Sequence, residues 1–321
     1  MKINWYVLNS GKLFKQSPPV GWPKKSLSKL GENWFDIEAD DPEELNNFLA
    51  PLDLHPVQLS RCLDAIDDPG VVSYGKTLLM EYPAAFDQGS DAPAYLTILL
   101  RAPLMVTIRH GLVPELDDLM RNLTADRAPA LHHLPQVIYL ILDQFADLNV
   151  EAQIDTRDRI LNLAKTLAED PNSVSAGELS QLRWQVNKLV SLIENQLYCV
   201  TGLNASDNAA LHEPHRKAYI QDLVSEAEIA QRGVYRLEAR VNDLYNDYQM
   251  AGNDRVEKRL RLLTIVSVIT LPLGLIAGLL GMNVGGVPGT TFTFGFGTVV
   301  LIMIVIIAIQ YFYFKRSGWF D

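Results

Sequence analysis

The C-terminal part of this 321-residue sequence lacks charged residues altogether. No Asp, Glu, Lys, Arg or His occurs from Leu262 to Phe314. A helix needs only about 20 residues to cross the ~30 Å hydrocarbon core of a membrane, so this stretch is too long for one span. The segment Met282–Thr291 is rich in Gly and Pro and cannot continue a helix. The absence of charge therefore predicts two membrane spans, 262–280 and 294–314, joined by a short outer loop, 281–293.

The sequence also has few cysteines and no net positive charge. The two cysteines, Cys62 and Cys199, lie far apart without CxxC spacing, which excludes a zinc finger and indicates two reduced, half-buried thiols. A net charge of −10 argues against a nucleic-acid partner. The sequence has no GxSxG, GxxxxGK(S/T) or HExxH motif, so we do not expect an enzyme.

Basic residues flank the pair of predicted spans on both sides. They are Arg255, Lys258, Arg259 and Arg261 before the first span, and Lys315 and Arg316 in the short tail 315–321. The loop between the spans carries no charge, so the positive-inside rule predicts that both termini are cytoplasmic and the loop is external. The first residues have neither an apolar core nor a small-residue cleavage site, so we expect no secretory signal and a cytoplasmic location for the large N-terminal part.

The first 110 residues mix strand and helix signals, which predicts an α/β domain. The expected strands are short apolar or alternating runs: Ile3–Leu8, Trp34–Glu38, Leu78–Tyr82, Ala94–Leu100 and Leu104–Arg109. Helices are expected from about Asp41, at Pro56–Ala65, Pro114–Leu123, Pro135–Glu169 and Ala176–Thr201. Asp41 and Ser175 have the composition of helix N-caps, and Glu178 completes a capping box with Ser175.

A long stalk helix is expected over 213–261, after a cytoplasmic domain over 1–212. Its apolar or small residues alternate at spacings of three and four from Ile220 to Ala251. Such a seam needs a partner along its length. The partner could be an antiparallel helix of the same chain or identical helices of other copies around an axis, and the spacing favours neither.

The two spans differ in composition. The first contains small and weakly polar residues, whereas the second is almost entirely bulky and apolar apart from Gln310. Small residues let helices approach closely or face water, and bulky ones suit the lipid bilayer, so the first span is expected to line a path. The candidate pore-lining residues are Leu263, Thr264, Ser267, Leu271, Gly274 and Gly278, and the candidates for an inner vestibule are Asn246 and Asn253. Gly274 and Gly278 form a GxxxG motif, which tight packing explains equally well.

Pro272 interrupts the first span. It has no N–H for the carbonyl of Val268, and we expect a nearby hydroxyl or a water to pair with that carbonyl. Two spans of one chain cannot enclose a water-filled path, so transport would require several copies around an axis.

The tripeptide Gly281-Met282-Asn283 follows the first span directly. A ring of Asn283 carboxamides could hydrogen-bond the water shell of a cation at the outer mouth without stripping it. No Cys or His lies in the membrane segment, so tight inner-sphere binding of a transition metal is not expected there. The alternative is a helix C-cap, because Gly and Asn both tolerate left-handed backbone.

This combination resembles the CorA superfamily of divalent-cation transporters. The resemblance rests on Gly281-Met282-Asn283 after a first span, two C-terminal spans, a basic-aromatic tail, and the segments Trp34-Phe35-Asp36-Ile37, Leu54-His55-Pro56, Asp67-Asp68-Pro69 and Val106-Thr107-Ile108-Arg109. The loop Val284–Gly289 has no acid and looks like the ZntB zinc-transporter branch. The resemblance implies αβα layers in the cytoplasmic domain, a homopentamer with an axial pore, Zn²⁺ as cargo and a bacterial inner-membrane location.

The resemblance leaves energy coupling open, because no intramembrane carboxylate or His offers a proton carrier. It suggests a regulatory cation site at Asp67 and Asp68, for which a plain turn is the alternative. His212 and His215 could also hold a metal, or could simply begin the stalk helix. No cofactor is expected besides the transported Zn²⁺. The competing functions are a CorA-like Mg²⁺, Co²⁺ or Ni²⁺ channel and a membrane-anchored coiled-coil scaffold.

Overall fold

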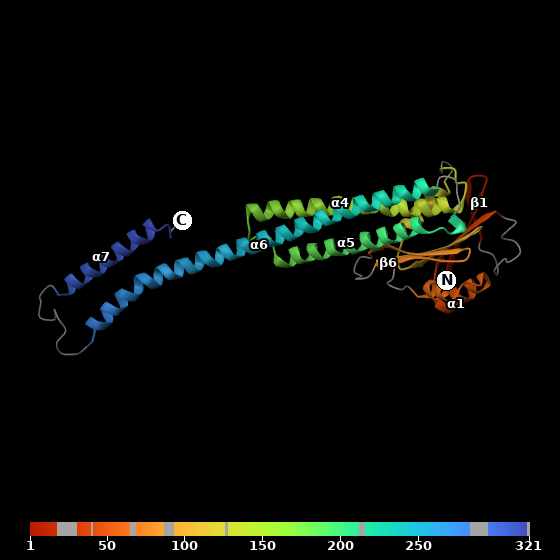
Figure 1. Cartoon of the computed structure of the whole chain (residues 1–321). Coiled ribbons are helices and arrows are strands. Elements are labelled where there is room, and N and C mark those ends of the chain that lie inside the picture. Colours follow the sequence, from red (N-terminus) through yellow and green to blue (C-terminus); the bar gives the residue numbers. More distant parts are fainter. Residues whose placement is uncertain are drawn as a thin grey trace. The chain divides into compact units, whose positions relative to one another are not determined.

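The chain forms two compact units, Met1–Leu244 and Tyr245–Asp321. The computed structural model, drawn in Figure 1, describes residues 1–17, 31–39, 41–64, 69–86, 93–125, 128–211, 216–282 and 295–319.

The first unit contains a seven-stranded sheet in the order β2-β1-β3-β7-β6-β5-β4. The strands are β1 Lys2–Asn9, β2 Lys12–Gln16, β3 Glu32–Glu38, β4 Gly70–Tyr74, β5 Thr77–Phe86, β6 Pro93–Arg101 and β7 Leu104–His110. Neighbouring strands pair antiparallel except β3 and β7, which are parallel. The five predicted strands are all present. The two that were not predicted, β2 and β4, are the edge strands; β2 is largely exposed and polar, and β4 is a short strand of five residues that is partly buried.

Both faces of the sheet are covered. Alternate residues such as Phe35 and Val106 belong to one core that includes Leu45, Leu49 and Cys62 of the helices α1 (Pro42–Leu49) and α2 (Pro56–Leu63). Their neighbours Trp34 and Met105 belong to a second core with the longer helices on the opposite face (Figure 1). This is the predicted α/β arrangement in αβα layers, because side chains of a strand alternate between its two faces.

The remaining helices follow the sequence signals closely. They are α3 Pro114–Leu123, α4 Leu134–Glu169, α5 Ala176–Ala205, α6 Arg216–Leu280 and α7 Gly295–Arg316, with short 3₁₀ turns at Ala50–Leu52 and Ala209–Leu211. Both predicted N-caps are confirmed. Asp41 accepts a hydrogen bond from the N–H of Glu43 at 2.9 Å, and Ser175 accepts one from that of Glu178 at 3.1 Å.

The seam of α6 is buried within the chain as far as Leu244. Ile220 and Leu223 belong to the main core, and Ala230 and Val234 pack with Leu189, Leu192 and Ile193 of α5. For this part of the seam, the partner is therefore a helix of the same chain. The stalk and the first span are one continuous helix, and the first compact unit ends within it.

A buried ion pair holds the parallel strands β3 and β7 together. Arg109 donates to both carboxylate oxygens of Asp36, at 3.0 and 2.8 Å. The hydroxyl of Thr107 donates to Asp36 at 2.9 Å and accepts from the indole of Trp34 at 3.0 Å. Two of the segments that carry the family resemblance, 34–37 and 106–109, therefore form a structural network in the sheet.

Both cysteines are free and fully buried, rather than half-buried as expected. Burial, together with the nearby charge of Glu81, raises the pKa of the Cys62 thiol to about 12. A thiol in this environment stays protonated and unreactive at neutral pH.

Candidate functional site

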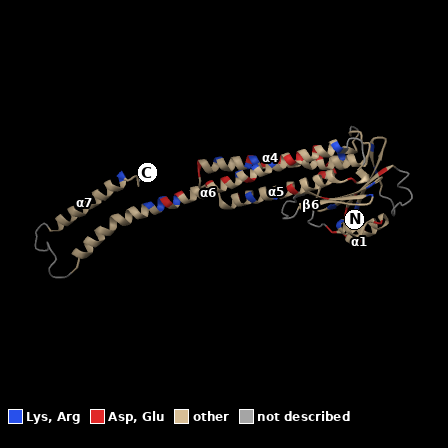
Figure 2. Cartoon of the chain, viewed as in Figure 1, with Lys and Arg blue, Asp and Glu red and all other residues tan. Residues whose placement is uncertain are grey.

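The second unit contains the apolar half of α6 and the whole of α7. Both helices are long and apolar enough to cross a membrane. Figure 2 shows that charged side chains colour α6 only up to the start of this apolar half and reappear in the last turn of α7. The predicted pair of candidate spans is therefore present, and each span has a basic flank at the predicted end.

The two apolar helices cover each other along one face. On α6 the partly or fully buried side chains recur every three to four residues, as Arg261, Ile265, Ile269, Pro272, Leu273 and Ile276. On α7 they are Val299, Met303, Ile306, Gln310 and Phe314. This spacing is the period of a helix, so one stripe of each helix is covered.

The opposite side of α6 carries the predicted path residues. Asn246, Asn253, Thr264, Ser267, Leu271, Gly274 and Gly278 are all exposed within the chain. Their spacings of seven and of three or four residues place them on one stripe of a continuous helix. Leu260, which the sequence analysis did not single out, fills the gap in this stripe and is 58% exposed. We call these uncharged residues the neutral stripe; the charged side chain of Glu257 interrupts it between Asn253 and Leu260.

At its inner end the neutral stripe borders the tail of the same unit, because Leu260 and Thr264 line a groove together with Ser317, Gly318 and Trp319. From Ser267 to Gly278 the stripe is exposed in the part of the chain that the structure describes. A Cβ atom added at Gly274 or Gly278 would meet nothing within 4 Å, so neither glycine serves a close approach inside this chain. Leu271 is 72% exposed in the single chain. Leu263, the remaining predicted pore residue, lies at the edge of the stripe and is 61% exposed.

The outer end of α6 is closed by Gly281. Its N–H donates to the carbonyl of Ala277 at 2.9 Å, and a Cβ there would approach the same oxygen to 3.0 Å. Met282 follows and is 54% exposed. Asn283 and the rest of the outer loop, 284–294, lie outside the described residues. The described part thus supports a helix end at Gly281, and the role of Asn283 stays a prediction.

The carbonyl that Pro272 frees has a partner that the sequence analysis did not identify. The side-chain amide of Gln310 in α7 donates to the carbonyl of Val268 at 3.1 Å. The hydroxyls of Thr264 and Thr270 instead donate to Leu260 and Val266, at 2.8 and 2.7 Å. The expectation of a hydroxyl partner is therefore wrong, because each threonine bonds the carbonyl four residues before it on its own helix.

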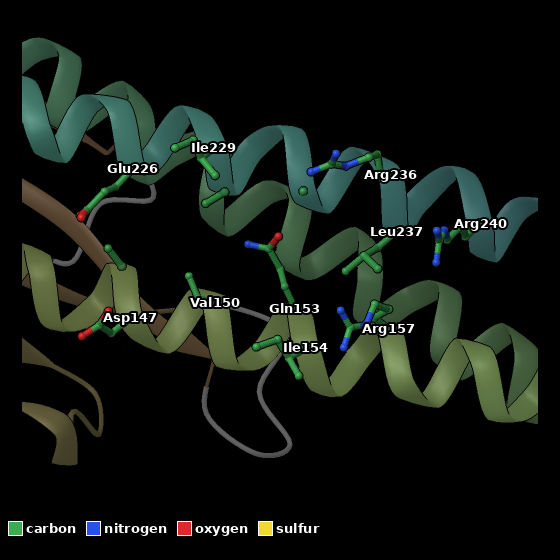
Figure 3. Close-up of a pocket in the computed structure, with 13 residues that line it drawn as sticks. Asp147, Val150, Gln153, Ile154, Arg157, Glu226, Ile229, Arg236, Leu237 and Arg240 are labelled. Carbon is green, nitrogen blue, oxygen red and sulfur yellow. The ribbon is translucent and has the colours of Figure 1, made fainter.

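A groove of about 460 Å³ lies between α4 and α6 in the first unit. Figure 3 shows Asp147 and Glu226 towards one end, Arg157 and Arg240 towards the other, and apolar side chains between them. Burial raises the pKa of Glu226, and the charges of Asp143, Asp222 and Asp147 raise it further. The sequence analysis missed this groove because its two walls are about 80 residues apart in the chain.

The cytoplasmic metal candidates receive no structural support. Asp67, Asp68, His212 and His215 all lie outside the described residues. Within the described ranges, no group of three or more His, Cys, Asp or Glu residues is arranged to hold a metal ion.

Comparison with known proteins gives a consistent result. The family model described as CorA-like Mg2+ transporter protein matches residues 31–316. The zinc transport protein ZntB of Yersinia enterocolitica is 25% identical over 208 residues, which are 64% of this chain and 62% of that protein. The chain thus matches less than two thirds of the length of this relative.

Two solved structures share the fold. The CorA magnesium transporter of Methanocaldococcus jannaschii superposes with a TM-score of 0.83 at 16% identity, covering 99% of both chains. The cytoplasmic domain of ZntB from Vibrio parahaemolyticus superposes with a TM-score of 0.62 at 10% identity, covering 78% of this chain and 98% of that one. At these identities the likeness concerns the fold alone.

Proposed function

Because the chain belongs to the family of CorA-like Mg2+ transporter proteins, we propose that it carries divalent cations across a membrane and that its cargo is Zn²⁺. The observation that carries this proposal is the neutral stripe of α6. Its hydroxyl, leucine and glycine residues from Ser267 to Gly278 are exposed in the chain, and nothing among the described residues lies within 4 Å of a Cβ built at Gly274 or Gly278. Copies of the helix around an axis would turn these rows towards a common path.

The chemistry of the stripe suits a hydrated ion. Amide and hydroxyl oxygens can hydrogen-bond the water shell of a cation, whereas thiolate or imidazole would bind Zn²⁺ tightly and slow its release. Leu260 and Leu271 would form apolar rings between the polar positions, and such constrictions can gate a pore by excluding water. The path would thus bind weakly enough for an ion to leave.

The assembly that we propose is a homopentamer with Asn283 around the outer entrance. Both termini would be cytoplasmic, in a bacterial inner membrane, since the basic flanks Arg255–Arg261 and Lys315–Arg316 lie at the same end of the pair of spans. Zn²⁺ is favoured over Mg²⁺ because the outer loop lacks an acidic residue, and because similarity to a zinc transport protein supports the same cargo. Proton coupling is a further part of this proposal.

The test is metal uptake into proteoliposomes that contain the purified full-length protein. Zn²⁺ and Mg²⁺ are compared with and without a pH gradient, for the wild type and Asn283→Ala. We expect Zn²⁺ flux that falls at least about tenfold in the variant, since a pore-mouth oxygen ring would be lost. Asn162→Ala, the same change at an exposed position of α4, serves as the matched control and should transport normally.

Each other outcome has a definite meaning. Mg²⁺ flux without Zn²⁺ flux would show that Zn²⁺ is not the cargo, while the protein still transports a divalent cation. Flux that ignores the pH gradient would contradict proton coupling. No flux of either ion through folded, oligomeric protein would favour the membrane-anchored scaffold instead.

A further inference from the structure

Gln310 is the polar exception in an apolar helix. From Val299 to Ile309 every residue of α7 is aliphatic or methionine, and the amide follows directly. Its nitrogen donates to the carbonyl of Val268 at 3.1 Å, 42 positions away in the chain. Pro272 has left that carbonyl without its helical N–H partner, and an unpaired carbonyl in lipid costs several kcal/mol. The bond therefore pairs a carbonyl whose usual helical partner, the N–H four residues later, is missing.

The carbonyl oxygen of the same side-chain amide argues against a purely stabilising role for Gln310. The Oε1 atom of Gln310 is buried and has no hydrogen-bond partner among the described residues. A leucine or methionine at this position would avoid that unpaired oxygen, because apolar side chains carry no group to satisfy. What glutamine offers, and these residues lack, is a donor that reaches another helix.

The position of the bond connects it to the neutral stripe. Pro272 is next to Leu271 and two residues before Gly274, both of which lie on the stripe, whereas Pro272 itself lies on the covered side. A proline kink is set by how the freed carbonyl is paired. The course of α6 past Leu271 and Gly274 thus depends on a contact made by α7.

We propose that Gln310 is a positioning residue of the transport path. By pairing with the carbonyl of Val268, it ties α7 to the turn of α6 that contains Pro272 and fixes the placement of Leu271 and Gly274. Gln310 does not touch the ion. Its loss should therefore change the maximal rate of transport and leave apparent ion affinity and selectivity unchanged. The transport part rests on the proposed function, but the bond itself does not.

A double-mutant cycle tests the proposal in the full-length protein. The variants are Gln310→Met, which keeps the length and removes the donor, Pro272→Ala, and the two combined. In the Pro272→Ala background a backbone N–H can donate to Val268, so the amide becomes redundant. Met303→Leu is the control, because Met303 lies two turns away on the same face of α7 and donates no hydrogen bond.

Two measurements are made on each variant: the midpoint of thermal unfolding in detergent, and Zn²⁺ and Mg²⁺ flux in proteoliposomes. We expect Gln310→Met to lower both the midpoint and the maximal flux, the latter by about 3- to 20-fold, the range that one interhelical hydrogen bond supplies in membranes. In the Pro272→Ala background the same change should have no effect on either quantity. Met303→Leu should behave as wild type.

Equal effects of Gln310→Met in both backgrounds would overturn the proposal, as they would show a packing role independent of the proline. A changed ratio of Zn²⁺ to Mg²⁺ flux would also overturn it. If Gln310→Met fails to assemble, the combined variant must assemble, or the proposal is wrong. If the wild type carries neither ion, the proposed function fails, while the unfolding midpoints still decide whether residues 272 and 310 are coupled.

Discussion

At the scale of single residues, carboxylates of like charge lie close together at one end of the groove between α4 and α6. Burial raises the pKa of Asp143, and the charges of Asp147 and Asp222 raise it further. Glu226 lies in the same cluster, and its Oε2 atom is buried with no hydrogen-bond partner within the described ranges. Because its folded-state pKa is raised, the ionised form of Glu226 destabilises the folded unit at neutral pH.

Neutralising Glu226 should therefore stabilise the protein in a pH-dependent way. A carboxyl whose pKa is raised in the folded state contributes stability to the fold. This contribution is fully present below the unfolded-state pKa and is lost as the pH rises through the folded-state pKa. We expect Glu226→Gln to raise the unfolding midpoint at pH 7 by a few degrees at most, since the cluster is partly exposed. The gain should vanish near pH 4.

The measurement is thermal unfolding of both proteins across this pH range. Glu151→Gln, the same change at an exposed position of α4, is the control and should change little at any pH. A gain for Glu226→Gln that persists unchanged at low pH would show that the carboxylate charge is not responsible.

At the scale of elements, α6 combines three tasks in one helix. As far as Leu244 its seam packs on α5 and the main core, and further along its opposite sides face α7 and present the neutral stripe. In a continuous helix each residue is rotated by a fixed angle from the one before it, so the orientation of one residue sets that of the residues further along. The angular position of Asn246 therefore determines that of Ser267, about six turns later and ahead of Pro272.

Filling the stripe at a glycine should block the path without harming the chain. A Cβ atom at 278 meets nothing within 4 Å in the part of the chain that the structure describes, so we expect Gly278→Leu to fold and assemble, yet to lose at least about tenfold in cation flux. Gly297→Leu on α7 is the matched control, since nothing lies within 4 Å of a Cβ there either. Normal flux through an assembled Gly278→Leu protein would remove Gly278 from the path.

At the scale of the whole molecule, the neutral stripe is the face that the proposed homopentamer would enclose. In the single chain Ser267 and Leu271 are exposed on this face. Copies of the helix around an axis would turn these residues towards one another.

Cross-linking at the stripe tests this arrangement. We expect Leu271→Cys to form disulfide-linked dimers of the full chain on oxidation in the membrane, because neighbouring copies would bring the thiols together around the axis. Ile276→Cys, on the side covered by α7, should not cross-link. The native cysteines need no replacement, since both are buried. The native mass of the purified complex should equal five chains of 35.9 kDa, and any other multiple would contradict the pentamer.

Much of the fold could be predicted from the sequence because the signals are local. The charge-free run from Leu262 to Phe314 predicts two spans, since each charge placed in lipid is costly wherever the rest of the chain lies. The caps at Asp41 and Ser175 depend on residues two or three positions away. Apolar alternation predicted the central strands and failed at the two edge strands, β2, whose side chains are mostly exposed, and β4, which has only five residues.

Only the tertiary structure decided which distant groups meet. Arg109 pairs with Asp36 across 73 positions, and Gln310 with Val268 across 42. From the sequence, the seam of α6 could pack against a helix of this chain or of another copy. The structure shows that it packs within this chain, on α5, as far as Leu244. Local patterns determine each segment because they reflect its own hydrogen bonds and solvation. Pairing between segments depends on register and helix rotation, which follow from the packing of the whole chain.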